Sequence, residues 1–530
     1  MSDKQLFKAW VPRWLIFVTT LLLLLPTLLL FAMSTANVSA AVGYYGIEPA
    51  DVQFSLLVFY AAIAAFTPLE ARFFNRIATK EYLLICLSLQ LVFAYAVYHS
   101  HHLGLILPIR FLQGIVNCGT TSICLNLLFR QLTSGHSREI GYSIFYGLIL
   151  CVAPLTSLMA APLIDQYDYK VIYKAVTFCI IPGAVMLLSI MHNVRLSRKT
   201  PLSQLDWISF VLYASALVLI AYILVYGQQL NWLDNTIIRY GVFLAPLLLG
   251  LSYVRQKSIK RPYIDVHVFR YKNVWIGIFL LIMLYLVRGS FNLSNQYFAE
   301  VLGMDPIHTY RFLLWNIFGI VIGCSFSTRL VILKKSLRAL WCVGFSLLAI
   351  YHISMVYLFG AEANADSYIF LLILQGIGAG LLMGPIVLFI ISSVPSAISK
   401  SASAVGVFIR FTTFSLSLAS LNFYQRYYGQ LHSDQLADRL DQSNPMFAQR
   451  LSLYKQALVN KGMLGDQAGK AADLLLAKSL QKQSFLRYCM DYYALMALIC
   501  VVTIALILLL PIINKTIINV KHKQPAAAGF

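Results

Sequence analysis

The stretch "LLLFAMSTANVSAAVGY", residues 28–44, joins an apolar run to a group of polar but uncharged side chains. The polar members of the stretch are Ser34, Thr35, Asn37 and Ser39. No acidic or basic residue occurs anywhere in it. With the apolar residues before it, the run is long enough to cross a hydrocarbon layer of about 30 Å. We therefore expect a membrane-spanning helix over residues 14–36 that leads into a neutral polar segment.

The same composition continues along the whole chain. Of its 530 residues, 59% are hydrophobic and 12% are charged, whereas a soluble domain has about 45–50% apolar and about 25% charged residues. Apolar runs between charged or Gly/Pro/Asn-rich breaks predict about fourteen spans. They lie near residues 14–36, 50–69, 82–98, 105–128, 140–163, 171–191, 207–226, 237–254, 274–294, 307–328, 338–359, 367–393, 402–423 and 488–513. The sequence thus predicts an all-α polytopic membrane protein.

The distribution of positive charge predicts the orientation of these spans. With a cytoplasmic N-terminus, the inner loops hold about 25 Lys and Arg and the short outer loops hold about four. Such an excess marks the cytoplasmic side, so we expect both termini to be cytoplasmic. The net charge of +20 then reflects topology and does not indicate a nucleic-acid partner. One outer segment, 424–487, is long and polar with helical apolar spacing, and we expect it to form an external helical hairpin.

The motifs of energy-coupled and catalytic membrane proteins are missing from the sequence. "GDQAGKAAD", residues 465–473, lacks the spacing and the Ser/Thr of a P-loop. The nine cysteines contain no C-x-x-C pair, and "HSHH", residues 99–102, lies in a short outer loop, so we expect neither a disulfide nor a metal site. A membrane enzyme or a lipid-handling protein is the alternative class, but no loop offers paired carboxylates or a nucleophile–base set. Many spans without a nucleotide site indicate transport driven by an ion gradient, with no cofactor.

Five stretches, taken in order along the chain, carry a family resemblance. They are "RFLQGI" (110–115), "LDWISF" with "YGQQLNW" (205–210 and 226–232), "RPYIDVHVFRYKNVWIG" (261–277), "NQYFAEVLGMDPI" (295–307) and "NKGMLGDQAGKAADLLLAKSLQKQSFLRYCMDYYALM" (460–496). Together they resemble the fourteen-span drug:proton antiporters (EmrB/QacA type) of the major facilitator superfamily. The resemblance covers nearly the whole chain.

The resemblance implies a fold and a function. It implies a six-helix bundle in residues 1–206, two additional spans in 207–254 and a second six-helix bundle in 255–530. Substrate would bind between the bundles near the bilayer midplane, with access alternating by rocking. It further implies a multidrug-type exporter of amphiphilic organic compounds in a bacterial inner membrane, driven by an ion gradient such as that of protons. An EmrA-like periplasmic adaptor and an outer-membrane channel would be its partners. A carrier for one anionic metabolite, such as a siderophore, stays open as an alternative.

The sequence departs from the family in its gating loop. The family reads G-x-L-A-D-R-x-G-R-R between its second and third spans, where this chain has "ARFFNRIATK", residues 71–80. Arg76 and Lys80 keep basic positions, but Asn75 replaces the acid. Because an amide can only hydrogen-bond, we expect a weaker latch between the bundles. Pro154 in "APLTSL" keeps a bend in the fifth span.

The twelfth span carries a repeat of small residues. Gly376, Gly380 and Gly384 recur at every fourth position. This spacing is typical of helices that pack at close distance in membranes. We therefore expect the three glycines to serve structure and not substrate binding.

The first span lacks the family's acid. Setting Asn37 and Val38 on the N-V of L-D-x-T-I-V-N-V-A places Ala32 where the aspartate should be. No predicted span holds a central Asp or Glu, and the acids nearest the membrane are expected at its rims: Asp51, Glu70, Asp165 and Glu300. A rim acid would titrate near its solution value of about 4.3. We therefore expect coupling through substrate-borne protons or a different ion.

Three arginines lie inside apolar stretches, where a charge is costly unless it faces a cavity or a partner. They are Arg110, Arg288 and Arg410. For Arg110, bonding within the protein to backbone or Gln113 and binding of a ligand both stay open, whereas for Arg288 we expect the cavity. Arginines without an acid would attract a carboxylate or phosphate. The candidate substrate-binding residues are Arg110, Gln113, Asn117, Arg288, Asn292, Asn295, Asn316, Gln375 and Arg410.

Overall fold

A computed structural model describes residues 6–74, 77–132, 135–195, 205–259, 261–438 and 445–509. Within these ranges, fourteen helices are long and apolar enough to cross a membrane. The predicted number of spans is confirmed, and so is an all-α fold.

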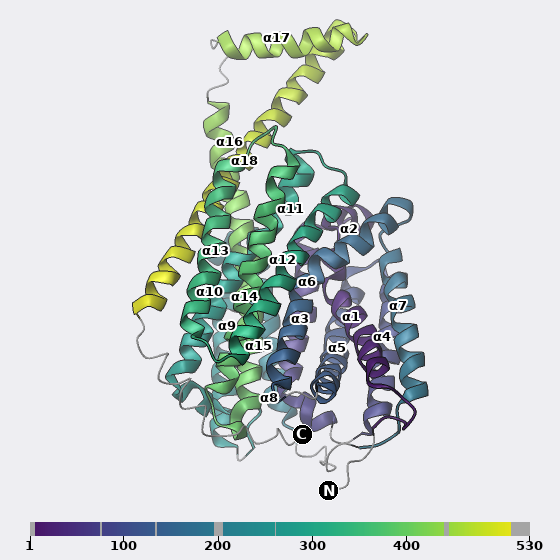
Figure 1. The fold of residues 1–530 in the computed structure, drawn as a ribbon. Helices are drawn as coiled ribbons and strands as arrows, with labels where there is room; N and C mark the ends of the chain where they lie inside the picture. Colours follow the sequence, from purple (N-terminus) through teal and green to yellow (C-terminus); the bar gives the residue numbers. More distant parts are fainter. Residues whose placement is uncertain are drawn as a thin grey trace.

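We describe the spanning helices (Figure 1) in the groups of six, two and six that the sequence resemblance implies, and call the two groups of six the first and the second bundle. The first bundle contains α1 (Arg13–Ala32), α3 (Pro49–Phe74), α4 (Thr79–His99), α5 (Leu103–Gln131), α6 (Ser137–Gln166) and α7 (Val171–Ile190). The additional pair is α8 (Trp207–Tyr226) and α9 (Thr236–Ser258). The second bundle contains α10 (Lys272–Gly289), which leads into α11 (Phe291–Gln296), α12 (Pro306–Ile332), α13 (Leu337–Leu358), α14 (Ile369–Ser392), α15 (Ser399–Phe423) and α18 (Gly465–Leu509). We call the end of the molecule where α1 begins the lower end and the opposite end the upper end, as they appear in Figure 1.

The longest departure from the predicted spans concerns the outer segment. α15 continues through a π-helical turn, Tyr424–Tyr428, into α16 (Gly429–Ala437), and α17 (Pro445–Asn460) follows. α18 is then one helix of 45 residues that includes the last span. Its length is roughly 67 Å at 1.5 Å per residue, about twice a hydrocarbon layer. The outer segment is helical and projects above the bundles, with α17 across the tip (Figure 1).

Glycines hold two helices of the second bundle at close distance. A Cβ atom on Gly376 of α14 would lie 2.2 Å from the carbonyl oxygen of Asn316 on α12, and one on Gly380 would lie 2.7 Å from that of Ile320. Glycines of α12 contribute to the same contact. A Cβ on Gly319 would lie 2.2 Å from the carbonyl oxygen of Ile373 on α14. Close contact was expected at all three α14 glycines, and it is present at Gly376 and Gly380.

Gly384, the third glycine of the series, takes no part in this crossing. The atom nearest to a Cβ built on it is the Cα of Ser143 on α6, at 4.0 Å. An alanine fits there at ordinary contact distance. Gly384 thus differs from Gly376 although both lie on α14.

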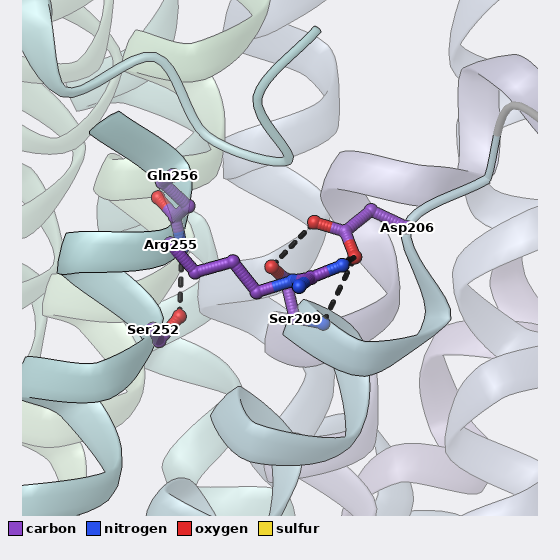
Figure 2. Close-up of polar contacts among 5 residues, drawn as sticks. All are labelled: Asp206, Ser209, Ser252, Arg255 and Gln256. Carbon is purple, nitrogen blue, oxygen red and sulfur yellow. Dashed lines mark hydrogen bonds and ion pairs between the residues drawn. The ribbon is translucent and has the colours of Figure 1, made fainter. Parts of the chain in front are cut away.

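The additional spans are joined to each other at the lower end. Asp206, the acid of the "LDWISF" stretch, precedes α8, and its Oδ1 accepts a hydrogen bond from the backbone N–H of Ser209 at 3.2 Å. Arg255 of α9 donates to the same oxygen from Nη2 at 3.1 Å (Figure 2). One turn of α9 also holds a bond from Gln256 to Ser252 at 2.8 Å. Asp206 therefore caps α8 and ties α9 to it.

These contacts change the acidity of Asp206. Burial alone would raise the pKa of this carboxyl, but the hydrogen bonds from Ser209 and Arg255 outweigh burial and lower the pKa below its ordinary value. A carboxyl with a lowered pKa in the folded protein stabilises the fold above its unfolded pKa of about 3.9. This contribution is lost as the pH falls through the lowered folded pKa.

The glycine crossing leads to a first prediction. Gly376→Ala should destabilise the protein by about 1–3 kcal/mol, because its Cβ would force the backbones of α12 and α14 apart. Thermal unfolding of the purified protein in detergent, followed by size-exclusion chromatography, measures this loss. Gly384→Ala is the matched control on the same helix and should unfold like the wild type. Equal melting temperatures for both variants would contradict the crossing.

A second prediction concerns Asp206. Asp206→Asn should lower stability at pH 7 by less than about 1 kcal/mol, because Arg255 is partly exposed and water screens the pair. The melting temperatures of wild type and variant, compared at pH 7 and pH 3, test the assignment. The difference should be smaller at pH 3 than at pH 7, because the unfolded chain then binds a proton at this carboxyl and the folded protein begins to do so. A difference as large at pH 3 as at pH 7 would show that the ion pair is not its source.

Candidate functional site

The polar patch of the first span interrupts its helix. α1 ends at Ala32, a 3-10 turn covers Met33–Thr35, and α2 (Val38–Tyr45) begins after Asn37. Asn37 caps α2, since its Oδ1 accepts from the backbone N–H of Ala40 at 3.0 Å. The interruption exposes carbonyl oxygens that a continuous helix would pair internally.

Arg110 of α5 binds this interruption. Its Nη1 donates to the carbonyl of Leu30 at 3.2 Å and to Gln113 Oε1 at 3.2 Å, and its Nη2 donates to Ser34 Oγ at 2.9 Å. The guanidinium also lies over the ring of Phe59, 4.7 Å from its centre. Arg110 is fully buried. Of the two readings left open by the sequence, the contacts of Arg110 favour the structural one.

Other side chains bind two further carbonyls of the interruption, those of Ser34 and Ala36. Tyr169 of α7 donates to the carbonyl of Ser34 at 2.9 Å. Ser157 of α6 and Tyr310 of α12 both donate to the carbonyl of Ala36 at 3.2 Å. Tyr310 belongs to the second bundle, so this contact joins the two bundles near the upper end.

Three further candidate residues also bind neighbouring helices. Asn117 of α5 donates to the carbonyl of Thr27 on α1 at 2.6 Å. Asn316 of α12 donates to Gln375 Oε1 on α14 at 2.5 Å and to the carbonyl of Leu372 at 2.9 Å. Asn316 and Gln375 are each 1% exposed. They lie beside the glycine crossing and link the same two helices.

Arg288 lies at the boundary between the bundles. Its Nη2 donates to the carbonyl of Leu150 on α6 at 2.6 Å. In a regular helix this carbonyl would accept from residue 154, but Pro154 has no N–H. Arg288 therefore supplies, from the second bundle, the donor that the proline removes from the first. Its side chain is only partly buried.

Arg410 of α15 meets the same face of α6. Its guanidinium lies over the ring of Tyr146, 5.1 Å from the centre, and its Nε donates to the carbonyl of Gly406 at 3.3 Å. Tyr146 and Leu150 are one helical turn apart, so both arginines approach neighbouring positions of α6. Aromatic rings adjoin this region, with Tyr60 of α3 packed edge-on against Phe411 at 5.6 Å.

The other two candidate binding residues follow Arg288 toward the upper end. Asn292 is exposed and Asn295 is half-buried, both on α11. We call Arg288, Arg410, Tyr146 and Tyr60 the boundary site. Asn292 and Asn295 lie outside this set.

The gating residues are placed differently from the family pattern. Asn75 and Arg76 lie outside the described residues. Lys80 donates to the carbonyls of Leu188 and Met191 at 2.7 and 2.9 Å, at the end of α7 in its own bundle. The contact that crosses to the other part of the chain is made by Arg72, which donates from Nη2 to the carbonyl of Pro262 at 2.9 Å. The sequence comparison missed Arg72 because it occupies a variable position of the loop motif.

Two further ionisable groups are buried, an acid and a histidine. Glu70 lies near the lower end of its span, where a rim acid was expected, but its side chain is only 6% exposed. Its Oε2 accepts from Ser122 of α5 at 2.8 Å. His352 of α13 is fully buried, with Nε2 at 2.8 Å from Ser290 Oγ. His352 could have been recognised from the sequence, because it is a histidine inside an apolar run.

Comparisons with known proteins identify the fold family. The profile described as Major Facilitator Superfamily matches residues 15–419. Among solved structures, a peptide transporter POT in complex with sulfate aligns with a TM-score of 0.56 at 13% identity, over 95% of each chain. The proton:xylose symporter XylE aligns at 0.52 and 12%, over 79% of this chain and 90% of that one. The human organic anion transporter MFSD10 aligns at 0.51 and 11%, over 92% and 98%.

No curated protein sequence matches the chain significantly. At these identities the solved structures show a shared fold only. The family profile, in contrast, covers well over half of the chain. The protein therefore belongs to the major facilitator superfamily and is a secondary transporter.

Proposed function

We propose that this transporter is a multidrug-type exporter of amphiphilic organic compounds that carry an anionic group, driven by an ion gradient. The observation that carries the proposal is the pair Arg288 and Arg410 at the boundary of the bundles. Among the residues that the structure describes, neither arginine forms an ion pair with a carboxylate. A carboxylate or phosphate of a substrate would supply that partner.

The surroundings of the arginines fit the apolar part of such a substrate. Tyr146 lies against Arg410, and Tyr60 and Phe411 pack beside it. Aromatic side chains provide large contact areas with little loss of conformational freedom. A site with cationic ends and aromatic walls selects by charge and apolar area more than by shape, which suits a broad range of amphiphiles.

The Arg288 contact suggests how binding would couple to movement. In the present conformation, Arg288 serves the carbonyl of Leu150 across the boundary. A substrate anion that takes the guanidinium releases this carbonyl, which then needs water as a donor. Substrate binding would thus remove a link between the bundles and favour their separation, as alternating access requires.

The direction and the setting rest on the sequence resemblance. The motifs of the drug:proton antiporter branch favour export from the cytoplasm across a bacterial inner membrane. A carrier for one anionic metabolite, such as a siderophore, is the second candidate, and the same two arginines favour it. The breadth of substrates separates the two candidates, because a dedicated carrier would exclude most amphiphilic anions that a multidrug-type exporter accepts.

The projecting segment, which we define as α16, α17 and residues 465–480 of α18, is the proposed contact for a partner. It carries exposed apolar side chains, with Leu453 57% and Leu474 71% exposed. Isolated helices with such residues in water are typical of interaction surfaces. An EmrA-like periplasmic adaptor that leads to an outer-membrane channel is the partner that the resemblance favours.

A third prediction tests the boundary site. Arg288→Ala should lower transport of radiolabelled taurocholate, an amphiphilic anion, by about 10- to 100-fold, because a charge-assisted hydrogen bond contributes about 1.5–3 kcal/mol. Arg288→Lys should restore part of the activity, since a point charge lacks the planar fork of arginine. Uptake into everted vesicles measures the effect.

Arg239→Ala is the control for this series. Arg239 of α9 is exposed, lies outside the boundary site and donates to the carbonyl of Leu233. The variant should transport like the wild type. The amount of folded protein is measured in parallel. If Arg288→Ala lost folded protein in the same proportion as transport, its role would be structural and the binding proposal would be wrong.

A fourth prediction concerns the projecting segment. Replacing residues 445–470 by a short Gly–Ser linker should abolish export from intact cells, because the partner contact is removed. The same variant, purified and placed in liposomes, should still transport taurocholate, because the bundles are unchanged. Undiminished export from cells would contradict the adaptor proposal, whereas loss of transport in liposomes would assign the segment to the fold.

A further inference from the structure

Glu70 is a buried acid with an incomplete set of hydrogen bonds. It lies on α3 near the lower end and is 6% exposed. Its Oε2 accepts from Ser122, but its Oε1 is buried and has no hydrogen-bond partner among the described residues. An ionised carboxylate in this position would leave part of its charge without water or a donor, which is far more costly than a buried neutral acid. The geometry favours a proton on this group.

The groups that face Glu70 come from three other helices. α4 contributes Tyr82 and Cys86, and α5 contributes Cys118 beside Ser122. From the second bundle, the positive charge of Lys400 at the start of α15 acts on the carboxyl. The acid is therefore enclosed by hydroxyl and thiol groups of its own bundle, and a cation of the other bundle is close enough to stabilise its ionised form.

The position of Glu70 places it where the bundles must part. α3 packs directly against α15. Near the upper end these helices are joined by a reciprocal amide pair between Gln53 and Asn422, at 2.8 and 3.3 Å. Near the lower end, Tyr263 donates to the carbonyl of Ala65, and Arg72 binds Pro262. Opening the lower end breaks these last contacts and lets water reach the carboxyl.

A row of polar side chains extends from Glu70 toward the middle of the membrane. Ser122, which bonds the carboxyl, is next to Thr121, whose hydroxyl donates to Asn117 Oδ1 at 3.3 Å. One turn further along α5 is Gln113, which binds Arg110. The row covers about 13 Å of helix axis. It offers hydrogen-bonding groups between Glu70 and Arg110 at the interruption of α1.

We propose that Glu70 is the proton-carrying group of the transport cycle. The carboxyl holds its proton while the bundles enclose it and releases that proton to water at the lower end when they separate there. No bond other than O–H changes, and the carboxylate left behind is stabilised by Lys400 and water. This inference rests on the proposed ion-driven transport and replaces the expectation of substrate-borne protons or another ion, because that expectation assumed an exposed Glu70.

The test compares two transport modes of the full-length protein in liposomes, with radiolabelled taurocholate as the probe. Glu70→Gln should lose accumulation driven by a pH gradient by at least about tenfold, because an amide carries no exchangeable proton. Exchange of labelled for unlabelled taurocholate without a gradient should stay within about twofold of wild type, because the amide keeps the neutral shape. Glu300→Gln, an acid exposed near the upper end, is the matched control and should retain both modes.

A second readout is independent of any substrate. Infrared difference spectra of the detergent-purified protein between acidic and alkaline pH should show a protonated carboxyl band that Glu70→Gln removes and Glu300→Gln keeps. Ser122→Ala should move this band's titration to higher pH, since it removes a donor to the ionised form. Wild-type protein that shows the band but does not exchange taurocholate would refute the proposed substrate class and leave the Glu70 assignment supported.

Three outcomes would overturn the assignment. The first is gradient-driven accumulation by Glu70→Gln at the wild-type level. The second is loss of exchange together with accumulation in a folded Glu70→Gln variant, because the acid would then serve structure. The third is an unchanged carboxyl band in the spectrum of that variant.

Discussion

A backbone carbonyl at membrane depth must find a donor within the protein, and this constraint organises the first bundle. Its helices are interrupted at several positions, among them α1 at the polar patch and α6 at Pro154. At these two positions an arginine supplies the missing donor. Arg110 comes from the same bundle as α1, so its contact moves with the bundle. Arg288 comes from the other bundle, so its contact with α6 must break when the bundles part.

The contacts inside the second bundle differ in kind from the contacts at the boundary between the bundles. In the second bundle, α12 and α14 touch through paired glycines and through the amide pair of Asn316 and Gln375. These are short contacts without charge, and they favour movement of α12 and α14 as one body. At the boundary α6 packs against α12 and α3 against α15, and polar side chains such as Arg72, Arg288 and Tyr310 also reach across it. Rigid bundles with a separable polar boundary are the arrangement that rocking motion needs.

The sequence was sufficient for the fold because hydropathy is a property of each segment by itself. All fourteen spans follow from apolar runs, and their limits differ from the helices by a few residues except where α15 and α18 continue into the projecting segment. Glycine spacing also predicted a close crossing, since small residues act in the same way in any membrane helix. It could not tell that Gly384 faces α6 instead of α12.

The candidate site was harder to predict, because the role of a polar residue depends on what a distant segment brings to it. The sequence leaves Arg110 open between two roles, and the partners that favour the structural role, Leu30 and Ser34, are 80 and 76 residues away. Glu70 reads as a rim acid from its position in the sequence, and only the length of α3 and the place of Ser122 show that it is enclosed. The binding roles of Arg288, Arg410 and the other candidate residues remain predictions.

The continuous α18 has a mechanical consequence for the molecule. One stiff rod packs along α13 inside the second bundle and extends without interruption to the base of α17. A small tilt of that bundle therefore becomes a larger sideways displacement at the tip, as with the long arm of a lever. Any protein attached there would be displaced once in every transport cycle. The position of the tip outside the membrane would therefore change with the conformation of the boundary inside it.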